Sequence, residues 1–515
     1  MPWIQRSASH RFREVLARVF GIDPRTLAVF RMAIGFLLLL DLAIRATDLG
    51  AMYTDTGMFP RLDIARRYPS PWNWSFHFAS GEATYQAGLF GLAAILALSL
   101  LAGFGTRWAT IGSWLMLVSL QHRIPPVLNG GDGMLRMLLF WSMFLPLGRV
   151  WSVDAWRSAR RGGEPAGALP LEPVVSVASA AILLQMALMY FVSAIYKSNL
   201  VWWRGQVIAG TLAHDFYVKP AGEYFLQFPS VLTALTLGVF VLEWLGPVLL
   251  FCPTRTLWFR LPIILSLAAM HVAIEILLTV GLFSLVSIAG LSLFLPSGTW
   301  QWFRAARDRS SGPEPIATPT TQPPASRWSW AAGVLSSCAL VYVLLFNLAG
   351  LPGQPLGQAV FLDVGFLRTA CGLGQRWNMF DEVPSKDGWY VAWAKLRDGS
   401  EVDLLQQGRP VTWSRPEFPA GMFPNHRWRK SFREMAYTDA MGYQVFRAPA
   451  AAYLRRRWDA LHPGEKQVAE MDLVYCMETK GQAAEGPSFQ FIVRERLTQP
   501  GTSETRAARG QESSL

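Results

Sequence analysis

The 515-residue sequence has little charge, few cysteines and no nucleotide-binding loop. Charged residues make up 16% of the chain and hydrophobic residues 51%, which excludes an ordinary soluble protein. Its four cysteines, Cys252, Cys338, Cys371 and Cys476, show no spacing typical of a zinc or redox motif. The glycine-rich stretch "NGGDG" lacks the G-K-[ST] ending of a phosphate-binding loop. The N-terminal residues lack the core and cleavage site of a removable signal peptide, so we expect the first span to direct insertion.

Long apolar runs and aromatic residues are abundant, and they predict an integral membrane protein. The chain has 22 Trp and 31 Phe, and its net charge of +11 comes largely from arginines that flank apolar runs, so we expect no nucleic-acid partner. A spanning helix needs about 20 predominantly apolar residues. Roughly nine transmembrane helices are expected, in a polytopic all-α domain: 27–46, 87–104, 108–120, 134–147, 174–196, 231–251, 261–280, 282–295 and 328–348.

The arginines also predict the orientation of these spans. Because arginine is enriched on the cytoplasmic side of a membrane, the N-terminal arm and the groups at Arg107, 149–161, 255–260 and 304–309 indicate a cytoplasmic N-terminus. The segment that begins at Lys197 and the C-terminal domain are then expected on the outer face.

The domain boundaries follow changes in composition. We expect a transmembrane domain over 1–305, a Pro/Ser/Thr-rich linker over 306–327, a last transmembrane helix over 328–350, an extracytoplasmic α+β domain over 351–500 and a disordered tail over 501–515. "DGWYVAWAKLRDGSEVDLL" predicts a hairpin, and the stretches 427–434 and 453–459 predict helices. On the outer face, Cys371 and Cys476 could pair in a disulfide.

Ionisable residues within apolar runs are the candidate functional residues, since their burial is costly. Lys197 ends the charge-free run 174–196 and is either a membrane-surface anchor or a base at the mouth of a cavity. His271 and Glu275 are four residues apart on one helical face, where they form either a structural hydrogen bond or a proton-transfer pair. Arg31, Asp41, Arg136 and Glu243 also fall within spans.

Four stretches of the sequence resemble the HTTM (horizontally transferred transmembrane) domain, which bacterial proteins share with the vitamin K-dependent gamma-carboxylase. They are "FRMAIGFLLLLDLAIRATDLGAMYTDTGMFPR", "NGGDGMLRMLLFWSMFLPLGRVWSVDAW", "YFVSAIYKSNLVWWRG" and "HVAIEILLTVGLFSLVSIAGLSLFLPS", within about the first 300 residues. The later "LGQRWNMF", "DGWYV" and "PNHRWRK" resemble the extension of bacterial members of this family. The resemblance implies a protein of the bacterial cytoplasmic membrane.

The resemblance also implies a chemistry. In the carboxylase an unprotonated lysine deprotonates reduced vitamin K, oxygen adds, and the resulting alkoxide takes a proton from glutamate. Lys197 aligns with that lysine and His271 with an active-site histidine, so Lys197, His271 and Glu275 are the expected catalytic residues. Asn129, Asp132, Arg136 and Trp203 are expected to bind substrate or cofactor; no metal is expected. Where the carboxylase has a histidine this chain has Gly131, and its candidate substitutes are Asp132 and His122.

Two classes of function follow. The first is a quinol-dependent oxygenase or carboxylase-type enzyme that uses a reduced, vitamin K-like quinone at the outer face on an exported polypeptide or a membrane lipid. The second is a non-catalytic maturation or export factor that binds a partner through its outer domain, in which case Lys197 is an anchor. A transporter is disfavoured, because no paired short, broken spans indicate an inverted repeat.

Overall fold

A computed structural model describes most of the chain: residues 14–161, 172–214, 217–254, 256–300, 327–353, 364–383, 386–437, 442–479 and 488–496. The chain divides into two compact units. The helical unit comprises Met1–Leu49, Tyr68–Ala213 and Tyr217–Val383, and the mixed unit comprises Gly50–Arg67, His214–Phe216 and Pro384–Leu515. Of the residues that the sequence assigned to the outer domain, 351–353 and 364–383 thus belong to the helical unit. The predicted tail and nearly all of the predicted linker lie outside the described residues.

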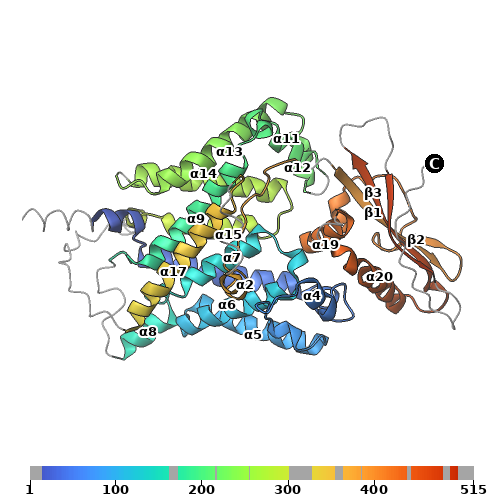
Figure 1. Ribbon diagram of the computed structural model, residues 1–515, viewed down its shortest axis with the longest axis horizontal. Coiled ribbons are helices and arrows are strands. Elements are labelled where there is room, and N and C mark those ends of the chain that lie inside the picture. The colour runs from blue at the N-terminus through green and yellow to red at the C-terminus, as the bar shows by residue number, and fades with distance from the viewer. Residues whose placement is uncertain are drawn as a thin grey trace, which may run out of the picture. The chain divides into compact units, whose positions relative to one another are not determined.

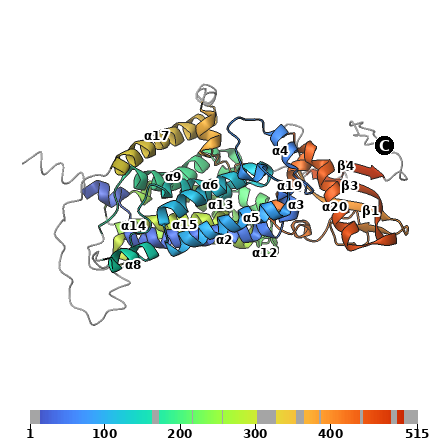
Figure 2. The same cartoon turned by 90° about the horizontal axis from the view of Figure 1, so that it is seen from below.

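In the described part of the helical unit, six helices are long and apolar enough to cross a membrane, and each coincides with a predicted span. In Figure 1, α13 and α14 lie side by side, and in Figure 2, α2 runs along α5. These six confirm the predicted membrane protein. They are α2 (Pro24–Ala46), α5 (Ala83–Ala102), α9 (Val177–Tyr196), α13 (Pro229–Leu250), α14 (Thr256–Leu277) and α17 (Arg327–Ala349).

The three remaining predicted spans are also helical, although shorter or less apolar. They are α6 (Thr106–Arg123), α7 (Gly130–Ser142) and α15 (Phe283–Leu291), the last continued by the 3-10 helix Ser292–Phe294. Whether these three cross the bilayer stays a prediction. Short helices join the longer ones: α8 (Val153–Arg160), α10 (Leu200–Trp203), α11 (Val207–Leu212) and α12 (Pro220–Phe225).

Local sequence signals explain where the long helices begin and how closely they pack. Asp23 caps α2 by accepting a hydrogen bond from the Arg25 backbone N–H, and Pro24 follows at the first helical position. Ser176 forms a capping box with Ser179 at the start of α9. Gly35 lets α5 approach α2, because a Cβ there would lie 2.8 Å from the backbone of Leu101.

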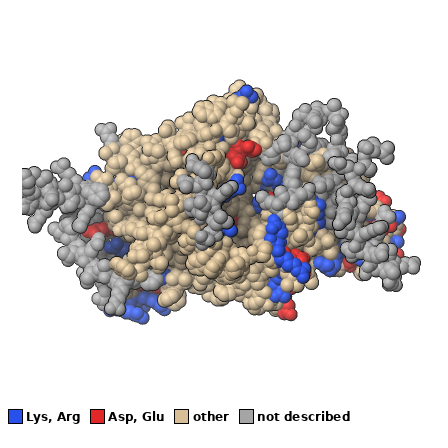
Figure 3. Space-filling view, in the orientation of Figure 1, with Lys and Arg blue, Asp and Glu red and all other residues tan. Residues whose placement is uncertain are grey.

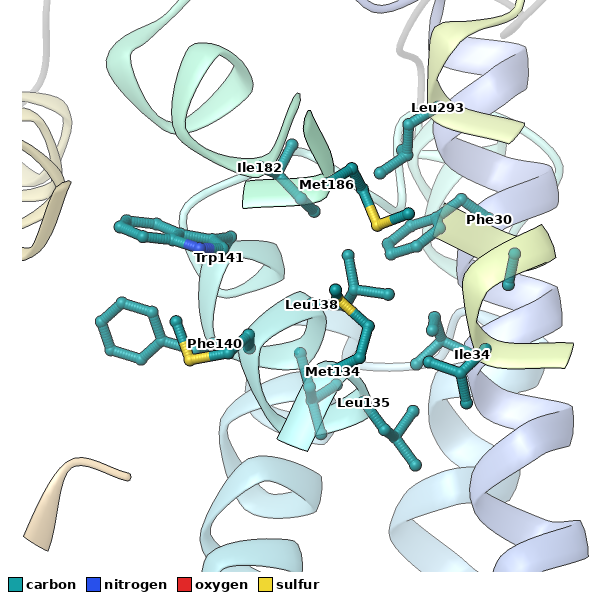
Figure 4. Packing of buried hydrophobic residues seen from close by; sticks show 14 of the residues in the cluster. Phe30, Ile34, Met134, Leu135, Leu138, Phe140, Trp141, Ile182, Met186 and Leu293 are labelled. Atoms are coloured by element: carbon teal, nitrogen blue, oxygen red, sulfur yellow. The ribbon is translucent and has the colours of Figure 1, made fainter. Parts of the chain in front are cut away.

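Apolar side chains from several helices make one core in the helical unit. Figure 4 shows Phe30 and Ile34 of α2 facing Leu138 of α7 and Met186 of α9, and all four are at most 1% exposed. Their interdigitation fixes the helices that carry the charged residues described below.

The described part of the mixed unit contains a four-stranded antiparallel sheet, two longer helices, and the short helices α3 (Leu49–Tyr53) and α4 (Arg61–Arg67). The strands, β1 (Lys386–Leu396), β2 (Glu401–Asp403), β3 (Val468–Thr479) and β4 (Ser488–Arg496), have the order β2-β1-β3-β4. β1 and β2 confirm the predicted hairpin, whose turn contains Gly399 at φ 85°. α19 (His426–Tyr437) and α20 (Arg447–Leu461) confirm the two predicted helices. Cys371 belongs to the helical unit and Cys476 to β3 of the mixed unit, so the suggested disulfide stays a prediction.

Candidate functional site

A lysine and a glutamate form a buried ion pair between α9 and α13. Lys197 caps the C-terminus of α9, and its Nζ lies 2.6 Å from Oε1 and 2.7 Å from Oε2 of Glu243. Lys197 is 5% exposed and Glu243 is 4% exposed. A surface anchor would extend its ammonium into the headgroup region, whereas this ammonium is withdrawn from it and held by a carboxylate.

An aromatic ring covers the ammonium group. Nζ of Lys197 lies 4.9 Å from the centroid of the Trp202 ring, a distance at which a cation is attracted to the ring face. Trp202 is buried, and its indole N–H donates to the Phe380 carbonyl. Trp203, the tryptophan expected to bind a ligand, is 63% exposed and packs on Phe240 instead.

A tyrosine and a histidine form a second buried pair next to the first. The Tyr190 hydroxyl lies 2.8 Å from Nε2 of His271, which is 1% exposed. Tyr190 precedes Lys197 by seven residues, or two helical turns, and so lies on the same face of α9. The charge of Lys197 is close enough to interact with His271, and that of Glu243 with Tyr190. The four side chains therefore form one cluster, contributed by α9, α13 and α14.

One polar atom of this cluster has no partner. Nδ1 of His271 is buried and makes no hydrogen bond with the described residues, while the Phe283 ring lies 5.3 Å from the imidazole centroid. A buried nitrogen without a partner costs about 1–3 kcal/mol, so such an atom in a native structure calls for a ligand or water. It could hydrogen-bond a hydroxyl or carbonyl oxygen of a small molecule.

Glu275 pairs with a different lysine. Its Oε1 is 3.5 Å from Nζ of Lys219, which also donates to the Glu275 carbonyl, and both side chains are about one-third exposed. Although His271 and Glu275 are four residues apart, the hydrogen bond described for the histidine is to Tyr190. The structure thus brings together two of the three expected catalytic residues.

Asn129 and Asp132 cap a helix. The Asn129 side chain accepts from the backbone N–H groups of Gly131 and Asp132, and Asp132 Oδ2 accepts from the Asn129 N–H, 2.8 Å away. This is a capping box at the start of α7. Oδ1 of Asp132 also accepts from Arg45, which binds Asp41 as well. The structure therefore gives these two expected ligand-binding residues a structural role.

Arg136 fastens the segment that follows the last long helix. Its guanidinium donates to the carbonyl oxygens of Gly372 and Gly374 and to the Gln121 side chain. We name residues 370–381 the return segment, because other polar side chains of the helical unit bind it too. Trp74 donates to the Ala370 carbonyl, Gln185 to the Gln375 side chain, Trp202 to the Phe380 carbonyl and Asn199 to the Asp381 carbonyl.

Gly131 has a steric reason to be glycine. A Cβ at this position would lie 2.8 Å from the backbone N and Cα of Phe283, at the start of α15. A histidine would therefore push α7 and α15 apart. Asp132 is engaged in the capping box, and Nδ1 of His122 lies 2.8 Å from the Trp74 carbonyl oxygen, so neither candidate substitute is brought to Lys197 by these contacts.

Glu243, Tyr190 and Trp202 were absent from the predicted site. Glu243 gave a signal, because it is the one carboxylate in the apolar run 231–251, but its partner is 46 positions away in the chain. The one sequence signal for Tyr190 was its position two helical turns before Lys197. Within the part of the chain that the structure describes, no three His, Cys, Asp or Glu side chains gather as a metal site.

The cluster offers acid–base chemistry. A hydrogen-bonded ammonium–carboxylate pair can become a neutral amine and carboxylic acid by moving one proton, which leaves the total charge at zero. The resulting amine is a base, and the tyrosine–histidine pair beside it can relay a proton.

Comparison with known families covers the region that carries this cluster. The HTTM domain model matches residues 21–300, which is more than half of the 515 residues and includes Lys197, Glu243, Tyr190 and His271. No solved structure matches the chain. The chain belongs to the HTTM domain family.

Proposed function

We propose that this membrane protein is a quinol-dependent enzyme in which Lys197 is the general base. The observation that carries the proposal is the burial of Lys197 in an ion pair with Glu243. A lysine at the surface needs no such partner. A lysine that acts as a base in an apolar site must first give its ammonium proton to an acceptor. After it has taken a proton from the ligand, it needs a negative charge beside it.

The roles of the side chains follow from their contacts. Glu243 takes the ammonium proton, which leaves the Lys197 amine free to accept a proton from a ligand hydroxyl. Trp202 covers the amine and limits the access of water to it. Nδ1 of His271, the buried nitrogen without a partner, orients the ligand by a hydrogen bond. A reduced quinone, when bound, would supply the electrons for oxygen chemistry.

The proposal also includes the side of the membrane on which Lys197 acts and the class of substrate. The Arg-rich connections around Arg107, Arg149 and α8 support a cytoplasmic N-terminus in a bacterial membrane. Lys197 ends α9, which begins among those connections, so it would face the outer side and act on a membrane lipid or an exported polypeptide. Glutamate carboxylation is not included, because Gly131 replaces the histidine that the carboxylase has and the packing excludes a larger residue there.

The test is whether a quinone is retained at Lys197. Protein purified in mild detergent would be extracted and its small molecules identified by mass spectrometry, for wild type, Lys197→Met and the control Lys219→Met. The control removes a lysine of the same unit that pairs with the half-buried Glu275. We expect wild type and control to retain a quinone and Lys197→Met to lose at least about ten-fold, the equivalent of about 1.4 kcal/mol.

Oxygen uptake supplies the second readout. With added reduced quinone, wild type and Lys219→Met should consume oxygen, while Lys197→Met should not. Equal retention and uptake by the three proteins would contradict the proposal.

A second candidate function is partner binding by the mixed unit. Its surface carries a pocket lined by Tyr390, Phe423, Tyr475 and Arg433, a mixture of aromatic residues and arginine that is enriched at protein interfaces. Recovery of the same polypeptide with wild type and Lys197→Met, together with no quinone in either, would favour an exported partner over an enzyme.

A further inference from the structure

A cavity of about 450 Å³ lies in the helical unit among the ends of α6, α7, α9 and α17. Its size is in the range of small-molecule pockets. The α5–α6 turn and the first residues of α8 are also there, since the Asp154 N–H donates to the Gly103 carbonyl. The cavity is separate from the Lys197 cluster, because its α9 residues belong to the first turn of that helix and Lys197 follows the last.

One wall of the cavity is apolar and made of small side chains. Ala178 of α9 and Ala332 and Gly333 of α17 line it, with Phe144 and Leu145 beyond the end of α7. Among the described residues, a Cβ on Gly333 would meet no atom within 4 Å, so they leave open space in front of this wall. The Ser336 hydroxyl donates to the Ala332 carbonyl and offers the cavity no free donor. This wall suits an unbranched hydrocarbon chain.

Two arginines contribute the positive charge of the cavity. Arg107 at the start of α6 and Arg149 before α8 both line it and are exposed. The acidic residue in the lining, Asp154, is engaged by the Gly105 N–H, the Thr106 N–H and the Thr106 hydroxyl at 2.6–2.9 Å. These hydrogen bonds outweigh its partial burial and hold the pKa of Asp154 below its ordinary value, so Asp154 is ionised. The two arginines and this one carboxylate leave the lining with one net positive charge. The cavity therefore attracts an anion.

The surroundings place this charge at the surface of a membrane. Trp108 and Trp330, in the first turns of α6 and α17, are 75% and 73% exposed. Trp156 on α8 is half-exposed and carries the Arg160 guanidinium over its ring. Figure 3 shows Lys and Arg side chains gathered at the lower left, where Figure 1 places α8. Tryptophan and arginine at the ends of apolar helices mark the headgroup level of a bilayer.

We propose that this cavity binds one anionic phospholipid, with its phosphate between Arg107 and Arg149 and an acyl chain along Ala178, Ala332 and Gly333. The two arginines together with the apolar wall favour an anionic phospholipid over other ligands. A free phosphate would use the arginines but leave the apolar wall exposed, and a zwitterionic lipid would place a second cation among the arginines. The lipid would connect α17 to α6 and α9 at this end of the unit.

The test uses native mass spectrometry of the detergent-purified protein, titrated with phosphatidylglycerol or with phosphatidylcholine of the same acyl chains. We expect one phosphatidylglycerol to bind at least about five-fold more tightly than phosphatidylcholine. Arg149→Gln should reduce that preference about five-fold, since a basic residue near an anionic lipid contributes about 1 kcal/mol. Equal binding of the two lipids by the wild-type protein would overturn the proposal.

A matched pair of variants tests the wall. Gly333→Leu fills the open space, whereas Gly91→Leu makes the same change on an exposed position of α5 where a Cβ also meets no atom within 4 Å. Gly333→Leu should lower phosphatidylglycerol binding about ten-fold and Gly91→Leu should not. Equal binding by the two variants, or displacement of the lipid by inorganic phosphate at millimolar concentration, would show that the wall contributes nothing and would overturn the proposal.

Discussion

Two buried ion clusters in the helical unit differ in the cation at their centre. Arg45 is 0% exposed, and its guanidinium donates to Asp41 at 2.7 Å and to Asp132 at 2.6 Å. Lys197 is nearly as buried and binds the single carboxylate of Glu243. Arginine stays protonated in proteins and presents several fixed donors, whereas a lysine ammonium can lose its proton.

The identity of the cation gives the two clusters different roles: the arginine cluster stabilises the fold, and the lysine cluster can transfer a proton. The arginine pairs with Asp41 of its own helix, ties α2 to the capping box of α7 through Asp132, and cannot release its charge. The lysine pair can exchange its charges for neutral groups without changing the net charge of the site. Burial and pairing alone would therefore have selected both clusters, and the identity of the cation distinguishes the one that can transfer a proton.

The largest expected effect is on the arginine cluster. Arg45→Met removes the guanidinium that two buried carboxylates share and should lower the free energy of unfolding by about 3–5 kcal/mol. Thermal unfolding in detergent measures it against Arg18→Met, which removes one arginine from an exposed pair with Glu14 and should cost less than about 1 kcal/mol. Similar melting temperatures for the two variants would remove the structural role assigned to Arg45.

The lysine cluster should respond less. Lys197→Met leaves one carboxylate, which can take up a proton, so we expect a loss of about 2 kcal/mol. The double variant Lys197→Met/Glu243→Leu removes both charges and should unfold within about 1 kcal/mol of wild type, although it would no longer retain quinone. A double-mutant cycle from the same unfolding curves measures the coupling, and purely additive losses would mean that the two charges do not depend on each other.

The smallest effect concerns His77, whose imidazole is 1% exposed and lies near the arginine cluster. Burial is the main cause that lowers its pKa from 6.5 to about 4; Gln86 opposes the shift, while Arg123 and Arg45 add to it. The unfolded chain therefore takes up a proton as the pH falls below 6.5, and the folded protein does so only near 4. Stability contributed by neutral His77 is complete above pH 6.5 and is lost between these values.

Unfolding measured at pH 7 and pH 5.5 tests this. The wild-type protein should lose about 1 kcal/mol more than His77→Gln over that interval. The same loss in both proteins would assign the pH dependence to other groups, and a gain in stability at pH 5.5 specific to wild type would reverse the sign.

The spans were predictable because their signal is local. About 20 apolar residues in a row require no knowledge of neighbours, and all six long runs are helices. The run 108–120 gave a weaker local signal, because the apolar residues of α6 stop before Gln121, His122 and Arg123. The hairpin after Asp387 was equally local, since its turn residues lie between its strands.

The partners of the candidate residues were not predictable in this way. Helical spacing placed His271 beside Glu275, but packing gave the histidine Tyr190, 81 residues earlier, and the glutamate Lys219. The sequence offered no means to choose between Trp202 and Trp203, because successive residues of a helix point about 100° apart and the orientation of the short α10 depends on its neighbours. Lys197 itself was identified because a charge ending a long apolar run is visible without the fold.

The return segment shows that the region matched by the family model is shorter than the domain that folds together. The family match ends at residue 300, whereas Arg136, Gln185, Asn199 and two tryptophans within that match bind residues 370–381. A protein cut at the family boundary would keep every matched residue and still lose the acceptors of these donors, including the carbonyl that holds Trp202 over Lys197. A fragment or fusion protein designed to contain this domain must therefore include residues 370–381. The matched region has all its hydrogen-bond acceptors only when this later segment packs against it.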